Sequence, residues 1–294
     1  MAAREGVVFV LTYQQPMARV TLLSVPRSGE PARQLSTFQG PGEPRGFAFT
    51  NEAAYLTENK ALIRLGLDGS SARLANDFGE GVAGDGSYVY GVGCGPKGGP
   101  DRLQRIKVTG GDPEHLAEIQ RAKVSSDGPA CDYRYVALGD ATVYVSDWAG
   151  RRILAFDRDS RAVKVLAEKK AFPQRIELAP GELAFQAAGG LYRVELPNGA
   201  PQRLAELANA PFARFVADAR DYWIDQAEAY AIEEKIYRLA RSGGKPREIQ
   251  RFKALDPNEA PADTGVDGIA VDDQCLYIAR HQPGYSAILA VAKD

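Results

Sequence analysis

The sequence predicts an all-β fold, a β-propeller whose blades are four antiparallel strands each, with seven blades favoured. One phrase of alternating apolar residues recurs along the chain, and two more short apolar runs precede each copy. The copies begin at Val20, Leu62, Leu103, Ile153, Leu191 and Ile236, and a shorter copy, ILAVAKD, begins at Ile288. Their spacing is mostly about 40 to 50 residues, which is the period of a four-stranded propeller blade.

Each repeat is interpreted as a meander of four strands, a to d. Before Ile153 the two preceding runs are YRYVALG and ATVYVSD, which are rich in Val and Tyr and alternate with period two, as strands do. Short turns such as GDG, GDA and PGE separate the runs, and they supply Gly and Asp where the backbone must turn. The repeated phrase provides strand c, its own turn and strand d.

The number of blades follows from the number of copies. Strands b and c occur seven times, but the first repeat shows no clear strand a and the seventh shows no strand d. A six-bladed ring with an irregular end is therefore the alternative. A β-sandwich would not repeat one phrase, and solenoid repeats are usually shorter. We expect residues 1–294 to form a single propeller domain.

Composition narrows the classes of partner. The 294 residues carry a net charge of −2, and 45% are hydrophobic and 25% charged, as in an ordinary globular protein. This charge gives no bulk attraction for nucleic acid, so no nucleic-acid partner is expected. No apolar run approaches the ~18 residues of a membrane helix, so no membrane insertion is expected. The first residues do not resemble a signal peptide, which indicates a cytoplasmic protein as written, or an extracytoplasmic one if a signal has been removed.

Three phrases carry a family resemblance: VYVSDWAGRRILAF, DYWIDQAE and IAVDDQCLYIARH. With their neighbours they resemble the bacterial YWTD-like and NHL-like propellers, and the resemblance extends from Val7 to Lys293. Several blades depart from the YWTD pattern, as in AYLTE, YVYGV and AFQAA. The resemblance implies a binding platform and, in some branches, a lactonase or lyase that uses the central channel. It does not choose between them.

The connections between strands define two faces. Because strand direction alternates, the a–b and c–d turns lie on one face, here called the turn face, and the b–c and d–a connections lie on the other, the loop face. The longest connections all belong to the loop face: 93–101, 125–133, 225–235, 252–265 and 280–286. Elaborated loops on a rigid scaffold usually carry function, although loop insertions are also tolerated without one.

A set of charged residues recurs where strand a begins, found by counting back from the aromatic residue of strand b. Its members are Arg45, Glu80, Arg134, Arg175, Arg214 and Asp267. In a propeller they would line the channel mouth on the loop face, where arginine forks suit carboxylate or phosphate ligands. The alternative is structural, with each arginine pairing with acids on a neighbouring blade. Both readings remain open.

Four other residues are candidates on the loop face. Cys94 and Cys131 lie in loops expected to be neighbours, so a disulfide is feasible, but two free thiols are equally consistent with the sequence. Trp148 follows strand b and could offer a stacking surface to a sugar or peptide. His281 is one of only two histidines, and a lone histidine is usually structural.

Signals for catalysis are weak. No spacing of His, Cys and carboxylates fits a zinc site, and no nucleophile elbow or phosphate-cradling glycine motif occurs. No cofactor is expected. A calcium or magnesium site built from acids of different blades stays open, with Glu80, Asp132, Asp147, Asp225 and Asp267 as the possible ligands.

Three functions are compatible with these observations. The favoured one is a non-catalytic platform that presents the loop face and channel mouth to a protein, a peptide or a small anionic ligand. The second is a divalent-metal-dependent, lactonase-like hydrolase or lyase that uses the channel mouth. The third is a structural module of a larger assembly.

Overall fold

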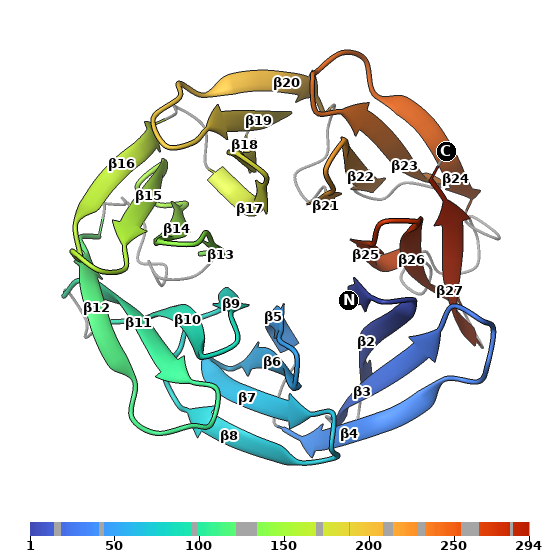
Figure 1. The fold of residues 1–294 in the computed structure, drawn as a ribbon, viewed down its shortest axis with the longest axis horizontal. Helices are drawn as coiled ribbons and strands as arrows, with labels where there is room; N and C mark the ends of the chain where they lie inside the picture. Colours follow the sequence, from blue (N-terminus) through green and yellow to red (C-terminus); the bar gives the residue numbers. More distant parts are fainter. Residues whose placement is uncertain are drawn as a thin grey trace. The chain divides into compact units, whose positions relative to one another are not determined.

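A computed structural model describes most of the chain. The described residues are 1–14, 19–40, 44–95, 99–121, 134–168, 173–187, 189–207, 214–227, 233–253, 265–282 and 285–293. In these ranges the only regular elements are β-strands, and they form seven sheets, each a meander of sequential strands (Figure 1). The seven-blade count is therefore confirmed, and the six-bladed alternative is wrong.

Six sheets have four strands. Blade 1 contains β1 (Ala2–Arg4), β2 (Val7–Gln14), β3 (Arg19–Pro26) and β4 (Arg33–Gln39). Blade 2 contains β5 (Pro44–Phe49), β6 (Ala53–Glu58), β7 (Ala61–Gly66) and β8 (Ser71–Ala75). Blade 3 contains β9 (Val82–Gly84), β10 (Tyr88–Gly93), β11 (Asp101–Lys107) and β12 (Glu114–Ile119).

The remaining blades continue the same order. Blade 4 contains β13 (Val136–Leu138), β14 (Thr142–Asp147), β15 (Arg152–Asp157) and β16 (Val163–Glu168). Blade 5 contains β17 (Pro173–Ala179), β18 (Glu182–Ala187), β19 (Gly190–Glu195) and β20 (Gln202–Glu206). Blade 6 contains β21 (Arg214–Ala217), β22 (Asp221–Ala227), β23 (Glu233–Ala240) and β24 (Arg247–Lys253). Blade 7 contains β25 (Gly265–Val271), β26 (Cys275–Gln282) and β27 (Tyr285–Ala292).

The two incomplete blades had different outcomes. The prediction that blade 1 lacks strand a is wrong, because β1 pairs antiparallel with β2, with Ala2 opposite Phe9. The sequence signal was weak because β1 is three residues long and contains no β-branched or aromatic residue. The prediction that blade 7 lacks strand d agrees with its three-stranded sheet in the described part of the chain.

The chain divides into two compact units. One contains Met1–Val10, Val25–Pro31 and Glu177–Asp294, and the other contains Leu11–Ser24 and Ala32–Ile176. The single-domain assignment stays a prediction.

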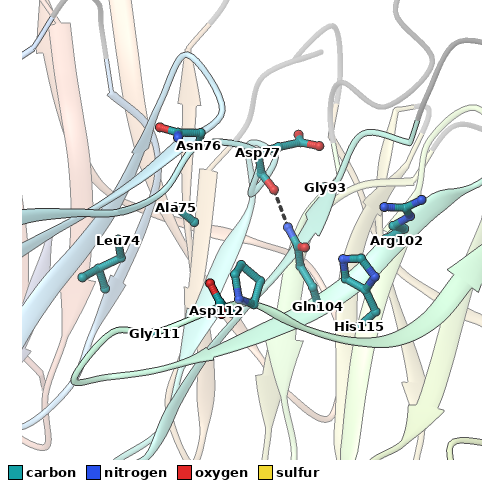
Figure 2. Close-up of a pocket in the computed structure, with 11 residues that line it drawn as sticks. Leu74, Ala75, Asn76, Asp77, Gly93, Arg102, Gln104, Gly111, Asp112 and His115 are labelled. Atoms are coloured by element: carbon teal, nitrogen blue, oxygen red, sulfur yellow. Dashed lines mark hydrogen bonds between the residues drawn. The ribbon is translucent and has the colours of Figure 1, made fainter.

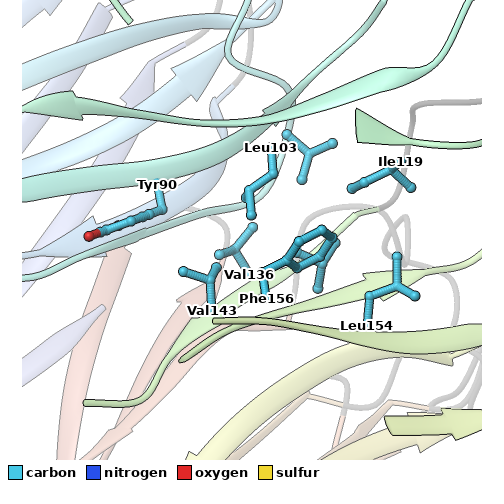
Figure 3. Close-up of a cluster of buried hydrophobic side chains, with 9 residues drawn as sticks. Tyr90, Leu103, Ile119, Val136, Val143, Leu154 and Phe156 are labelled. Atoms are coloured by element: carbon cyan, nitrogen blue, oxygen red, sulfur yellow. The ribbon is translucent and has the colours of Figure 1, made fainter. Parts of the chain in front are cut away.

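Apolar side chains fill the spaces between neighbouring blades. Between blades 3 and 4, side chains from both sheets interdigitate, among them Tyr90 and Leu103 from blade 3 and Val143, Leu154 and Phe156 from blade 4 (Figure 3). Strand alternation sends residues to both faces of a sheet, and here the facing sides of blades 3 and 4 cover each other. A fully buried side chain of this kind contributes roughly 1.5–3 kcal/mol relative to an exposed one.

A β-bulge recurs in every four-stranded blade. In blade 4, Ile153 is opposite Ala167 and Leu154 is opposite Val165, so Leu166 is the extra residue. The same irregularity occurs between β3 and β4, β7 and β8, β11 and β12, β19 and β20, and β23 and β24. The extra residues are Leu35, Leu74, Leu116, Leu166, Leu204 and Ile249. Each is half-buried, so the bulge places a leucine or isoleucine of the fourth strand at a fixed point.

Glycines set the approach of successive first strands in the unit that contains blades 2 to 4. A Cβ added at Gly46 of β5 would lie 2.0 Å from the Glu80 carbonyl oxygen, and one at Gly81 would lie 2.0 Å from the Arg134 carbonyl oxygen. Only a residue without a side chain permits backbone contact this close.

We predict that Gly81→Ala destabilises the protein by about 1–3 kcal/mol, because overpacking against backbone forces the two blades apart. Gly86→Ala is the matched control, since no atom lies within 4 Å of the added Cβ. Urea unfolding of both variants checks this, and equal midpoints would show that the close contact is unimportant.

Candidate functional site

The six charged residues lie at or near the starts of the first strands of blades 2 to 7. Arg45, Arg175 and Arg214 lie within the first three residues of β5, β17 and β21. Glu80 and Arg134 precede β9 and β13. Asp267 lies in β25, and its side chain is outside the described part of the structure. These residues are divided between the two compact units.

Arg134 is the most deeply buried of the set. Its side chain is 2% exposed, and its Nη2 lies 2.9 Å from Asp101 Oδ2 and 3.2 Å from Asp147 Oδ1. Burial lowers the pKa of the Arg134 guanidinium, and the carboxylates of Asp147 and Asp101 oppose this change. The side chain bridges blades 3 and 4, so the structural reading is favoured at this position.

The two acids that hold Arg134 have further partners. Asp101 accepts from Arg121, with Nη2 at 2.6 Å from Oδ1, and Arg121 also donates to the carbonyl of Gly95. Asp147 accepts from Arg152 Nε at 2.8 Å. Both carboxylates are fully buried, so their charges depend on these arginines.

Asp147 belongs to a pattern of acids at the end of the second strand. Glu58, Asp147 and Asp225 close the runs AYLTE, VYVSD and DYWID, and all three are buried. Asp225 lies 3.9 Å from Arg214 Nη1, across the pair formed by the first and second strands of blade 6. The acids that end these three second strands therefore have a buried, structural environment.

The other charged residues of the set are more accessible. Arg45 is exposed, and Arg175, Arg214 and Glu80 are half-buried. The backbone carbonyl of Glu80 accepts from the Thr57 hydroxyl at 2.7 Å, which ties blade 3 to blade 2. The repeat position is thus shared, but the environment of the side chain differs from blade to blade.

The remaining candidates on the loop face are only partly described. Trp148 is half-buried in the turn after β14. Cys94 is disulfide-bonded and Cys275 is a free thiol. Cys131, the partner considered for Cys94, lies outside the described residues, as does Asp132. His281 lies in β26 opposite Gly265, and its side chain is not among those described.

A cavity that the sequence did not indicate lies between blades 2 and 3 (Figure 2). Its volume is about 390 Å³. Arg102, Gln104 and His115 of blade 3 line it, and Asp77 and Asp112 line it from connecting segments. Gln104 Nε2 donates to the Asp77 backbone carbonyl at 2.5 Å, so β11 is joined to the segment that follows β8. No hydrogen bond or ion pair joins the side chains of Arg102, His115 or Asp112 to another described residue.

The turn face carries a repeated ionic contact that the sequence analysis also missed. A cation directly after the third strand reaches an acid of the preceding blade. Arg158 of blade 4 donates to Asp85 Oδ2 at 2.8 Å and to the Tyr90 hydroxyl at 3.0 Å. Arg241 of blade 6 donates to Glu182 Oε1 of blade 5 at 2.6 Å, and the Tyr222 hydroxyl donates to the same oxygen.

The same position is used twice more around blade 7. Lys293 Nζ donates to Asp218 Oδ2 of blade 6 at 2.7 Å. Arg27 of blade 1 interacts with Tyr277 and Asp272 of blade 7. Desolvation lowers the pKa of the Arg27 guanidinium, but Tyr277 and Asp272 raise it overall. Cations at a fixed offset from strand c were visible in the sequence, but the acids come from two different positions in the preceding repeat.

Neither a metal-binding cluster nor a membrane-spanning helix occurs in the described part of the chain. No group of three or more His, Cys, Asp and Glu side chains is placed to hold a metal ion there. Nor does that part contain a helix long and apolar enough to span a membrane.

Comparison with known proteins shows the fold. No protein-family model and no curated protein matches the chain. A crystal structure of a nidogen/laminin complex is similar over 84% of this chain and 92% of that one, with a TM-score of 0.56 and 13% identity. A putative TolB from Agrobacterium tumefaciens covers 76% of this chain and 85% of its own, with a TM-score of 0.53 and 14% identity. For TolB from Acinetobacter baumannii the TM-score is 0.57 and the identity 12%, over 82% of this chain and only 65% of the TolB chain.

The protein is therefore a seven-bladed β-propeller, as its sheets and these similarities agree. Identities this low show the fold alone, and they leave the YWTD-like or NHL-like repeat type a proposal.

We predict that Arg134→Met destabilises the protein by about 3–5 kcal/mol, because Asp101 and Asp147 would keep buried charges without their shared partner. Arg45→Met is the matched control on an exposed side chain and should change stability by less than about 0.5 kcal/mol. Chemical denaturation measures both. An Arg134→Met protein as stable as the unsubstituted one would contradict the structural role.

We also predict acid sensitivity at Asp218. Desolvation raises the pKa of its carboxyl, but hydrogen bonds from Lys293, from the backbone and from Trp223 together lower it to about 2. The unfolded value is about 3.9, so the stabilisation is complete above that pH and is lost as pH falls toward 2. Asp218→Asn should cost about 1–2 kcal/mol at pH 7 and progressively less below pH ~4. Asp159→Asn, in an exposed turn, should show no such pH dependence in thermal unfolding, and parallel curves for the two variants would refute the assignment.

Proposed function

We propose that this propeller is a non-catalytic binding platform, and that it binds a peptide segment of a partner protein at the cavity between blades 2 and 3. The observation that carries this proposal is the set of cavity side chains without a described partner: Arg102 and His115 on one side and Asp112 on another. Polar groups at a preformed concave site fix the orientation of a ligand and give it specificity.

The charges of the cavity select the chemistry of the segment. Arg102 offers a planar fork to a carboxylate, and His115 lies on the neighbouring strand. Asp77 and Asp112 offer acceptors for an ammonium group or for backbone N–H groups. A segment with both signs of charge satisfies both sides, whereas a simple anion would meet the two carboxylates.

The cavity lining extends from Asn76, Asp77 and Gly93, at the loop face, to Gly111 and Asp112 in the turn between β11 and β12. Asn76 and Asp77 follow the end of β8, and Gly93 is the last residue of β10. The exposed Arg45, at the start of β5 in the same unit, adds a second contact for acidic residues of the partner.

Similar structures support a platform only in general terms. One of them is a complex of two proteins, nidogen and laminin. The choice of ligand therefore rests on the cavity and not on the comparison.

We predict that the peptide Lys-Gly-Glu raises the melting temperature of the protein, because a ligand that binds only the folded state stabilises it by mass action. Arg102→Ala and Asp112→Ala should each abolish the shift. Arg73→Ala should retain it, because Arg73 is an exposed arginine of β8 outside the cavity. Differential scanning fluorimetry measures the shift, with isothermal titration for the affinity.

Two results would overturn the proposal. One is a peptide shift that survives Arg102→Ala, or no shift with any mixed-charge peptide. The other is a shift produced by calcium or magnesium and removed by a chelator, which would favour the metal-dependent hydrolase instead.

A further inference from the structure

We propose that the free edge of β27 in blade 7 is a second binding site, which accepts an extended strand of another polypeptide as the fourth strand of the sheet. This site is separate from the cavity between blades 2 and 3, and neither proposal depends on the other. Addition of a strand to an exposed sheet edge is a recurrent mode of peptide recognition.

Blade 7 differs from the other blades in one respect. Its sheet has the order β25-β26-β27, whereas each of the other six sheets has a fourth strand on its third. No strand in the described part of the chain pairs with the other edge of β27. This third strand is therefore built like the others but lacks their cover.

Blade 4 shows what the missing strand does. Residues Ile153–Arg158 read ILAFDR and residues Ile288–Lys293 read ILAVAK, so the two third strands are nearly the same in sequence. Their registers agree as well, because Arg158 N–H donates to Ala141 O and Lys293 N–H donates to Gln274 O. Leu154, which β16 covers, is 3% exposed, but the corresponding Leu289 is 39% exposed.

The backbone of β27 is arranged to receive a partner. In an antiparallel pair the N–H groups of alternate residues point to opposite sides. Lys293 N–H points toward β26, so those of Val291 and Leu289 do too, and the N–H and C=O groups of Ile288, Ala290 and Ala292 point to the free edge. In blade 4 the residues equivalent to Ile288 and Ala290 face β16.

The space beside this edge is also larger than its counterpart. A cavity of about 390 Å³ lies between blades 6 and 7, lined by Ile249, Val291 and Ala292 among others. The corresponding gap between blades 3 and 4, lined by the equivalent Leu116, Phe156 and Asp157, is only about 10 Å³. Arg161, from the turn that leads into the fourth strand, helps to line the smaller gap.

The six fourth strands of this chain define the chemistry of the incoming one. Each places a leucine or isoleucine at the bulge, and in β8, β12, β16 and β20 an alanine follows it. In β16 that alanine, Ala167, is opposite Ile153, so an incoming alanine would be opposite Ile288. The partner strand is therefore an extended segment with the pattern Val-x-Val-Leu-Ala or a close equivalent.

The test uses the fluorescein-labelled peptide SRAVKVLAEK, which is residues 160–169 of the chain, and the full 294-residue protein. Fluorescence anisotropy should show saturable micromolar binding. A peptide with aspartate in place of the bulge leucine should bind at least about tenfold more weakly. Ala290→Pro should weaken binding to the same degree, because proline removes an N–H that points to the free edge and breaks no existing ladder bond.

Ala290→Ser is the matched control, since it keeps the N–H and a similar volume, and it should bind within about twofold of the unsubstituted protein. Unchanged melting temperatures would show that both variants fold. Amide exchange measured by NMR gives an independent readout: the peptide should protect the amides of Ile288, Ala290 and Ala292 and leave Leu289 and Val291 unchanged.

Three outcomes would overturn the proposal. They are no binding of the peptide, equal binding by the Ala290→Pro variant, and protection confined to residues outside β27. Concentration-dependent self-association in sedimentation analysis that Ala290→Pro abolishes would assign the edge to a second copy of this chain, and it would also refute a heterologous partner.

Discussion

Each blade has two apolar faces, and the rest of the structure depends on covering both of them. A four-stranded sheet cannot do so alone, because the alternation of side chains along a strand sends apolar residues to both sides. Burial between blades 3 and 4 shows the solution, with Leu103 and Ile119 from one sheet meeting Val143 and Phe156 from the next. Gly46 and Gly81 allow the first strands to approach closely enough for this packing. Where the cover is incomplete, as on β27, the exposure of Leu289 reveals it.

Charged groups complete the contacts that apolar packing begins. On the turn face, a cation after the third strand reaches an acid of the preceding blade, as Arg158 reaches Asp85. On the loop face, Arg134 lies between Asp101 and Asp147. A buried pair of this kind adds little net stability, since desolvation offsets attraction, but it is costly to break. Such contacts therefore align neighbouring blades more than they stabilise the fold.

Sequence reasoning predicted the repeat and its strands because strand alternation and turn residues act locally. It placed the third strands of all seven blades, and it missed β1 because three residues of low β-propensity carry no period. It could not separate Arg134 from Arg45, although they occupy the same repeat position. Burial of Arg134 depends on Asp101, an acid from another blade, and Arg45 has no such described partner. The cavity beside Arg102 was equally invisible, because its lining comes from segments of two blades that no single repeat contains.

The direction of the ionic contacts on the turn face has a consequence for how such a chain can change in length. Blades 6 and 7 each carry both halves of the contact: an acid for the following blade, Asp218 or Asp272, and a cation for the preceding one, Arg241 or Lys293. A duplicated blade of this type would meet its original with matching charges at the new junction. Duplication of such a blade would therefore preserve the ionic contact at the new junction without substitutions in the neighbouring blades.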